Sequence, residues 1–200
     1  RLEELEGGVV RIVFDKPGSS VNAFNRATIE EFGAIVDHLA DRRDLHGAIV
    51  ASAKDSIFVA GADIKELFRP DLNENDVRDL IRLGQGMFNK LASLDLLTVA
   101  AIHGAALGGG CELALACDYR IATDAKSTRI GVPEVMLGIL PAWGGCTRLP
   151  RLVGLPVALD LILSGRGYPA RKAKRASPLD DASRLAALLQ GGLRMPGMTP

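Results

Sequence analysis

The chain has 200 residues, the size of one ordinary domain, and its hydrophobic content of 48% is enough to fill a core. Lysine and arginine total 24, as do aspartate and glutamate, so no net charge attracts nucleic acid or an anionic membrane. No stretch of the sequence reaches the roughly 20 apolar residues of a membrane span. The first residue is Arg1 rather than methionine, and no apolar signal segment follows it, so we expect both ends to be trimmed.

The three cysteines, Cys111, Cys117 and Cys146, show no CxxC pair, no metal-ligand spacing and no even count that would suggest a disulfide framework. We therefore expect reduced thiols in a bacterial cytoplasm or an organelle matrix, and we predict no metal site.

The first third of the chain predicts strands separated by a helix. Residues 7–14 alternate apolar and polar side chains, which is typical of a strand. Asn25 is a suitable cap for a helix in which apolar residues recur at helical spacing, namely Ile29, Phe32, Val36 and Leu39. Residues 47–51 form a short apolar run typical of a strand buried on both faces. We expect a loop over residues 52–62 and a short helix over residues 64–68.

The middle of the chain continues this alternation. Apolar residues from Val77 to Leu91 indicate a long amphipathic helix, and residues 98–102 indicate a buried strand. We expect this strand to run directly into Gly104 and the glycine cluster at residues 108–110. A helix over residues 111–117 and a strand over residues 119–122 follow.

The carboxyl-terminal part predicts a helix over residues 154–164, after which the composition changes beyond Lys174. We therefore divide the chain into a core, residues 1–175, and a linker or truncated segment, residues 176–200. Helices that separate short apolar strands predict an α/β architecture with helices packed outside a core of sheets.

Three consecutive glycines, Gly108, Gly109 and Gly110, stand where the predicted strand passes into a helix. Because glycine has no Cβ, a ligand can approach the peptide N–H groups there, and the amino end of a helix favours negative charge. The site could hold a phosphate or a developing oxyanion; alternatively, the glycines serve only a tight, well-packed turn. Phosphate is disfavoured because Glu112 stands close by and neither a Walker lysine nor a G-x-G-x-x-G pattern is present.

Glu134 stands in an apolar segment rich in glycine and proline, residues 131–145. A single glutamate of this kind is more often a helix cap or a surface residue. Paired with Glu112, however, it can form a site in which two carboxyl groups have different pKa values, one suited to donate a proton and the other to activate water. A third segment, residues 58–67, opens a short helix with small residues and has Asp63 as its cap; alone it indicates only a helix start.

Together, these three segments resemble the crotonase (enoyl-CoA hydratase/isomerase) superfamily over about residues 5–175. Residues 58–67 and 104–113 are similar to its two oxyanion segments, and residues 131–145 with 147–151 are similar to its acid/base segment. The resemblance implies an α/β fold built as a spiral of ββα units. It also implies a substrate carried as a coenzyme A thioester, with no other cofactor bound for catalysis.

The resemblance assigns roles residue by residue. The backbone N–H groups of Ala62 and Gly109 would form the oxyanion hole, and Glu112 and Glu134 would activate water and deliver a proton to the α-carbon. The substrate-binding residues that it implies are Ala62, Asp63, Ile64, Lys65, Gly108 and Gly109. Lys65 would lie near the phosphates of coenzyme A, and the loop around Asn22 and Ala23 would approach the same moiety.

Residues 13–22 resemble one subgroup more specifically, the multifunctional α-subunits of fatty-acid β-oxidation. That subgroup joins a hydratase to a 3-hydroxyacyl-CoA dehydrogenase, of which these 200 residues show no segment. The resemblance implies a homo-oligomer or a complex with a thiolase subunit. Residues 176–180 depart from the apolar stretch that leads into the carboxyl-terminal helical region of the family.

The sequence thus predicts an enoyl-CoA hydratase, with two alternatives left open: a Δ3-Δ2-enoyl-CoA isomerase at the same site, and a non-catalytic acyl-CoA-binding module. Cys111 is interpreted as buried filler rather than a nucleophile because no base lies near it in the sequence. His103 is interpreted as a structural group. Trp143 either lines the acyl channel or packs in the core.

Overall fold

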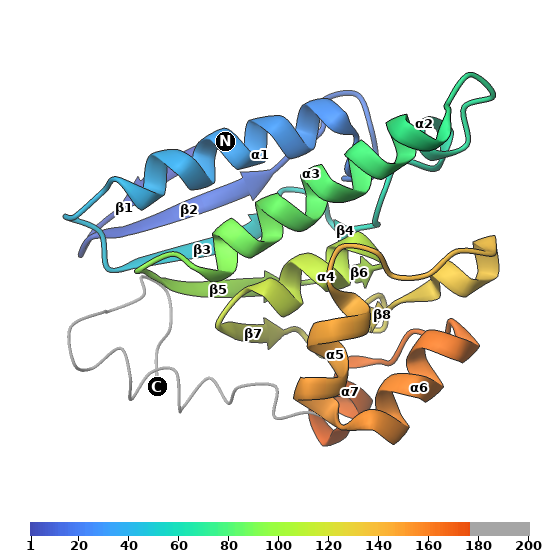
Figure 1. The fold of residues 1–200 in the computed structure, drawn as a ribbon. Coiled ribbons are helices and arrows are strands. Elements are labelled where there is room, and N and C mark those ends of the chain that lie inside the picture. The colour runs from blue at the N-terminus through green and yellow to red at the C-terminus, as the bar shows by residue number, and fades with distance from the viewer. Residues whose placement is uncertain (177–200) are drawn as a thin grey trace.

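The computed structural model describes residues 1–176, which form two sheets and the helices packed on them (Figure 1). The elements in chain order are β1 (Leu2–Leu5), β2 (Val9–Phe14), α1 (Arg26–Ala40), β3 (Gly47–Ser52), β4 (Ile57–Val59), α2 (Ile64–Leu67), α3 (Glu74–Ala92), β5 (Leu97–Ile102), β6 (Ala105–Leu107), α4 (Gly109–Ala116), β7 (Tyr119–Ala122), β8 (Arg129–Gly131), the 3-10 helix η1 (Pro133–Leu137), α5 (Gly145–Val153), α6 (Leu155–Ser164) and α7 (Ala170–Ala176). No helix within this described part is long and apolar enough to cross a membrane.

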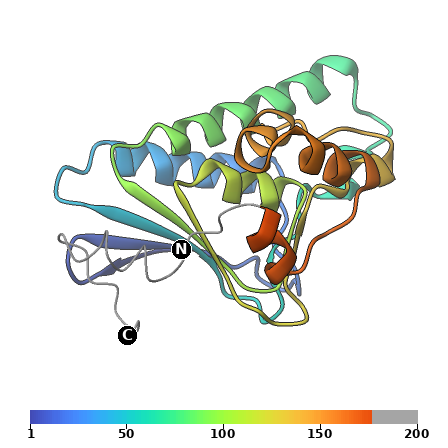
Figure 2. The ribbon, with the colours of Figure 1, turned by 90° about the horizontal axis from the view of Figure 1, so that it is seen from below.

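The chain alternates between two sheets in a regular order. The larger has the order β1-β2-β3-β5-β7 and the smaller β4-β6-β8, and all neighbours are parallel except β1 and β2. Three times the chain passes from a strand of the larger sheet to one of the smaller and then into a helix. In Figure 2 the sheets meet at an angle, with α1, α3 and α4 on its inner side. This repetition confirms the predicted α/β spiral of ββα units.

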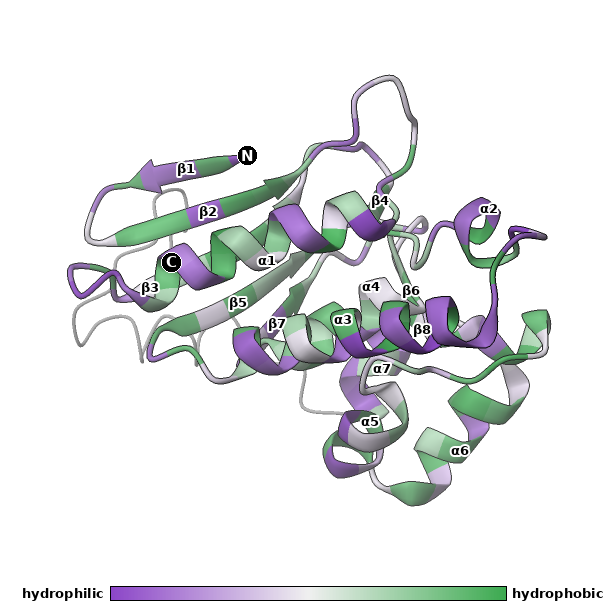
Figure 3. Cartoon of the chain, turned by 45° about the horizontal axis from the view of Figure 1, so that its top comes forward, coloured by the Kyte–Doolittle hydropathy of each residue, from purple (hydrophilic) through white to green (hydrophobic). Residues whose placement is uncertain are grey.

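Helices α1 and α3 lie side by side over the larger sheet and bury their apolar faces (Figure 3). Asn25 caps α1 by accepting a hydrogen bond from the backbone N–H of Thr28 at 2.8 Å, as predicted. The four apolar residues expected to face the core, Ile29, Phe32, Val36 and Leu39, are all buried. The strands and helices with clear periodicity therefore stand where the sequence placed them.

Three expectations about the chain path are wrong. The predicted loop over residues 52–62 contains β4, and strand β5 does not run directly into the glycine cluster, because β6 lies between them. The sequence predicts one strand between Glu112 and Glu134, over residues 119–122, whereas two strands, β7 and β8, lie between them. All strands of the smaller sheet are three residues long, so they are too short to show a period. These segments become strands because they pair with one another in the sheet, and the local sequence pattern does not reveal them.

An aromatic cluster joins the helices to the cavity described below. Phe24 makes edge contacts with Phe14, Phe88 and Trp143, at centroid distances of 5.5, 5.6 and 5.7 Å. Edge-to-face packing of this kind adds to the stabilisation from burial.

The boundary expected between residues 175 and 176 stays a prediction, since residues 177–200 lie outside the described part.

Candidate active site

A cavity of about 440 Å³ lies between α2, α3, the amino end of α4 and the segment from η1 to α5. Most of its wall is apolar, and its two carboxylates are Glu112 and Glu134. The lining residues are Ala60, Gly61, Ala62, Ile64, Leu67, Val77, Leu80, Ile81, Gly108, Gly109, Glu112, Pro133, Glu134, Leu137, Ile139, Leu140, Ala142 and Trp143. An apolar cavity with a few convergent polar groups is the usual form of a small-molecule site.

The backbone at Ala62 is held by a parallel bridge to Phe24. The bridge uses the carbonyl of Gly61 and the N–H of Asp63, at 2.8 and 2.7 Å from their Phe24 partners. In a parallel bridge the residue's own N–H points away from the partner, so the N–H of Ala62 is directed away from Phe24. A Cβ added to Gly61 would lie 3.5 Å from the nitrogen of Gly109, so the two segments are in contact.

Gly109 is the first residue of α4, and the N–H of a first helical residue has no partner within its helix. The glycines around it permit close packing. A Cβ on Gly108, whose φ is +54°, would lie 2.9 Å from Oε1 of Glu134, and one on Gly110 would lie 2.0 Å from the carbonyl oxygen of Val59. The amino end of α4 is therefore fixed between β4 and Glu134, with its dipole directed at the cavity.

Glu112 is almost fully buried, with 2% of its surface exposed. Its Oε1 accepts hydrogen bonds from the backbone N–H groups of Trp143 and Gly145, both at 2.8 Å. Since Gly145 opens α5 and the cap residue Gly144 has no side chain, this carboxylate caps α5 from a distant helix. Burial raises the pKa of Glu112, while the two N–H groups and the positive charge of Arg148 oppose the rise.

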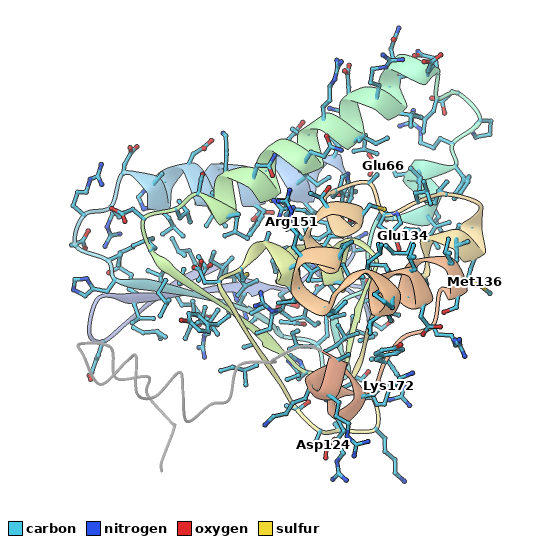
Figure 4. All side chains as sticks on the ribbon, turned by 60° about the horizontal axis from the view of Figure 1, so that its bottom comes forward. Glu66, Asp124, Glu134, Met136, Arg151 and Lys172 are labelled. Atoms are coloured by element: carbon cyan, nitrogen blue, oxygen red, sulfur yellow. The ribbon has the colours of Figure 1, made fainter. Side chains whose placement is uncertain are left out.

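Glu134 lies on η1 and points inward, whereas its neighbour Met136 points outward and is 74% exposed (Figure 4). Oε2 of Glu134 is buried and has no hydrogen-bond partner among residues 1–176. Burial, and then repulsion by Glu112, raises the pKa of Glu134 to about 7. Its carboxyl group can therefore take up or release a proton near neutral pH.

Arg148 on α5 braces the loop that holds Glu112. Its Nη1 donates to the carbonyl of Trp143 at 3.2 Å, and its Nη2 donates to Oδ1 of Asn89 on α3 at 2.7 Å. The guanidinium thereby joins two helices behind the loop from residue 143 to 145. It also places a positive charge close enough to Glu112 to lower the pKa of that carboxyl group.

Six predicted site residues line this one cavity, namely Ala62, Ile64, Gly108, Gly109, Glu112 and Glu134. Asp63 and Lys65 do not line it. The side chain of Asp63 caps α2 and pairs with Lys16 at 3.2 Å, and Lys65 is exposed, so their contacts with a ligand stay a prediction. Asn22 is buried: its Oδ1 accepts from the backbone N–H of Lys16, and its Nδ2 donates to the carbonyls of Phe14 and Phe58 and to the hydroxyl of Ser52.

The structure also decides between alternatives for three other residues. Cys111 is buried, and burial together with the nearby carboxylates raises the pKa of its thiol, which is the opposite of an activated nucleophile. The imidazole of His103 is hydrogen-bonded to the carbonyl oxygen of Lys54 outside the cavity, which confirms a structural group. Trp143 has both of its expected roles: it lines the cavity, and it packs in the core against Phe24 and Phe88.

The sequence did not reveal the apolar wall of the cavity or the brace at Arg148. Val77, Leu80 and Ile81 belong to the face of α3 that helical periodicity assigns to the core. Leu137, Ile139 and Leu140 follow Glu134 directly, and this excess of apolar residues next to a carboxylate was the one available signal. No group of three or more metal-ligating side chains lies together in the described part of the chain.

Comparison with known proteins agrees with this geometry. Residues 4–182 match the family described as "Enoyl-CoA hydratase/isomerase". The chain belongs to that family. It is 45% identical over 185 residues to the fatty acid oxidation complex subunit alpha of Vibrio cholerae serotype O1, and 40% identical over 194 residues to that of Shewanella amazonensis. These alignments cover 92% and 97% of the chain but 26% and 27% of the relatives, so the chain spans about a quarter of their length.

Solved structures show the same fold. An enoyl-CoA hydratase from Bacillus anthracis superimposes with a TM-score of 0.83 at 33% identity, over 96% of this chain and 73% of that one. Pseudomonas aeruginosa DspI superimposes with a TM-score of 0.84 at 30% identity, over 98% and 75% of the two chains. The family predicted from the three segments, its crotonase fold and the similarity to α-subunits of fatty-acid oxidation are thus confirmed.

Proposed function

We propose that this chain adds water across the 2,3 double bond of an enoyl-CoA in fatty-acid β-oxidation. The observation that carries the proposal is the convergence of four groups on one apolar cavity: the backbone at Ala62 and Gly109, and the carboxyl groups of Glu112 and Glu134. Hydration of an unsaturated thioester needs donors for the charge that develops on the carbonyl oxygen. It also needs one group to take a proton from water and one to give a proton to carbon.

The N–H groups of Ala62 and Gly109 receive the thioester oxygen, which becomes negative as water attacks C3. Glu112, stabilised as a carboxylate by two N–H donors at 2.8 Å, accepts a proton from the water. Glu134, with its pKa of about 7 and its Oε2 free of protein partners among residues 1–176, gives a proton to C2. The hydroxyl adds to C3, the hydrogen adds to C2, and transfer of the proton from Glu112 to Glu134 restores the starting state.

The first test replaces each carboxyl group by an amide of the same shape. We expect Glu112→Gln and Glu134→Gln each to lower kcat by roughly 10²–10⁴-fold on crotonyl-CoA, because each removes one proton-transfer group. Turnover is followed by loss of the enoyl-thioester absorbance. The control is Glu66→Gln, a partly buried glutamate on α2 that does not line the cavity and should keep wild-type turnover. Wild-type rates in either active-site variant contradict the mechanism.

One observation favours a second activity at the same site. A carboxyl group with a pKa of about 7 can take a proton from C2 of a 3-enoyl thioester and return it to C4, while the N–H groups of Ala62 and Gly109 stabilise the charge on the thioester oxygen; these steps make up Δ3-Δ2 double-bond isomerisation. Glu112→Gln separates the two reactions: it abolishes hydration of a 2-enoyl-CoA but leaves conversion of a 3-enoyl-CoA, whereas Glu134→Gln abolishes both. Calorimetry that shows tight acyl-CoA binding by a wild-type chain with neither activity would favour a non-catalytic acyl-CoA-binding module instead.

The names of the relatives support the remaining proposals. They are subunits of a fatty acid oxidation complex in bacteria. We therefore propose a cytoplasmic location, association with a thiolase subunit or with further copies of this chain, and no cofactor besides the coenzyme A of the substrate. Size-exclusion chromatography with and without a thiolase subunit tests the association.

A further inference from the structure

The indole of Trp143 fills the space above two glycines. A Cβ on Gly84 of α3 would lie 2.4 Å from Nε1 of Trp143, and one on Gly109 would lie 2.6 Å from Cζ3. No real Cβ atom lies this close to a ring, so the ring occupies the volume that a side chain at either position would take. Trp143 is 6% exposed and forms part of the cavity wall.

The indole stands where the cavity ends along α3. Val77, Leu80 and Ile81 line the cavity, and Gly84 follows about one turn later on the same face. Phe88, another turn on, is fully buried and packs against Trp143 at a centroid distance of 5.9 Å. Between the cavity and the buried aromatic cluster, the wall at Gly84 therefore consists of the indole rather than of a side chain from α3.

Three apolar lining residues, on α2 and on or near η1, are exposed to solvent, unlike Trp143. Ile64, Leu137 and Leu140 line the cavity and are 53%, 42% and 61% exposed. When a substrate is bound, its bulky, charged coenzyme A moiety can project out of the cavity only where the wall is open to solvent, as it is at these residues. The acyl carbons beyond a carbonyl bound at Gly109 then extend toward the inner wall.

We propose that Trp143 closes the inner end of the acyl cavity and limits the chain to short enoyl thioesters. This inference rests on the proposed hydration of enoyl-CoA. A long acyl chain would have to displace the indole toward Phe24 and Phe88, whose rings already pack against it. Because protein cores are packed like organic crystals, that displacement is unfavourable.

The test is a chain-length series with crotonyl-CoA and 2-hexadecenoyl-CoA. We expect Trp143→Leu to raise the ratio of kcat/KM for the 16-carbon over the 4-carbon substrate by roughly tenfold or more, since one misfitting methylene in an apolar pocket already changes kcat/KM by about tenfold. Trp143→Phe, which keeps an aromatic ring in the cluster, should change the ratio in the same direction by less. It remains informative if the leucine variant does not fold.

Two further variants make the result specific. Phe32→Leu removes a buried aromatic ring of the same core that does not line this cavity, and it should leave the ratio unchanged. Adding Gly84→Leu to Trp143→Leu puts a side chain back into the vacated space and should return the ratio toward wild type. An unchanged ratio in both Trp143 variants, with crotonyl-CoA still hydrated by the wild type, overturns this inference alone. A wild type that hydrates 2-hexadecenoyl-CoA but not crotonyl-CoA also overturns this inference alone, whereas failure to hydrate either substrate overturns the proposed function.

Discussion

Glu134 couples the chemistry of the site to the stability of the fold. Its pKa of about 7 in the folded chain lies above the ordinary value of 4.5, so between these values the folded state holds a proton that the unfolded chain has released. Since the state that binds more protons loses stability as pH rises, the wild type loses free energy of unfolding across this window. At higher pH the folded state carries a charge next to Glu112 in an apolar cavity.

Glu134→Gln removes that effect. We expect the variant to be more stable than the wild type above about pH 7, with the difference shrinking toward zero near pH 4.5. Denaturant unfolding at pH 5 and pH 8 measures it. Glu31→Gln, at an exposed position on α1, controls for the loss of a negative charge. A difference in stability that does not change with pH would show that Glu134 titrates normally.

Arg148 acts on the reaction through Glu112. Replacing it with methionine removes the positive charge that lowers the pKa of Glu112, so that pKa rises further. Because Glu112 must be a carboxylate to accept a proton from water, we expect the acidic limb of kcat to move to higher pH, with a larger loss at pH 6 than at pH 8. The lost hydrogen bonds should also cost about 1.5–3 kcal/mol of stability.

The pH profile separates this role from mere bracing. Arg148→Lys keeps the charge but loses the two-pronged contact to Trp143 and Asn89, so it should lower stability while leaving the acidic limb near its wild-type position. Arg151→Met, one turn further along α5 and exposed (Figure 4), should leave both properties unchanged. An acidic limb that stays in place in Arg148→Met would reduce Arg148 to a structural residue.

At the scale of elements, the contact between α4 and β4 decides where the helix dipole points. A Cβ on Gly110 would lie 2.0 Å from the carbonyl oxygen of Val59, which is backbone and cannot turn aside. Gly110→Ala must therefore move the amino end of α4 away from β4 and displace the N–H of Gly109. We expect a loss of stability of about 1–3 kcal/mol or more from this overpacking, and a lower kcat on crotonyl-CoA.

A matched substitution lies on α3. Gly86 is exposed within the helix, and an added Cβ meets nothing within 4 Å, so Gly86→Ala should stabilise the fold by about 0.5–1 kcal/mol and leave kcat unchanged. Thermal and denaturant unfolding measure both variants. Equal effects of the two alanines would mean that α4 is not tightly held against β4.

The elements also show what a sequence can and cannot reveal. Helices α1 and α3 have long, regular apolar periods and caps at Asn25 and Asn73, so local signals suffice to find them. Strands β4, β6 and β8 are three residues each, and only their pairing with one another in the smaller sheet makes them strands. The start of α5 also cannot be recognised from local signals, because its first turn is capped by Glu112 from another helix.

The candidate site divides in the same way. Glu112, Glu134 and the glycine cluster can be proposed from the sequence because polar or flexible residues in apolar surroundings are conspicuous. Apart from Ile64 and Trp143, the apolar wall cannot be predicted in this way, because a leucine that faces a cavity and one that faces the core have the same periodicity. Leu80 illustrates this: it is a buried core residue, 8% exposed, and it also forms part of the cavity wall.

At the scale of the whole molecule, the cavity joins parts of the chain that are distant in sequence. Its lining runs from Ala60 to Trp143 and includes residues of α2, α3, α4 and η1. A ligand in it contacts α2, α3, α4 and η1 at once, so binding should stabilise these elements together. Butyryl-CoA is a suitable ligand because its saturated chain cannot be hydrated.

At a butyryl-CoA concentration 100 times its Kd, we expect a stabilisation of about 2.7 kcal/mol and thus a rise in Tm of roughly 5–10 °C. Coenzyme A without an acyl group, at the same concentration as butyryl-CoA, should give a smaller rise, because it leaves the apolar wall between Leu80 and Trp143 uncovered and therefore binds more weakly. Differential scanning calorimetry over a range of ligand concentrations checks both expectations. Equal shifts from butyryl-CoA and coenzyme A would place the bound molecule outside the cavity and remove the basis for the acyl site.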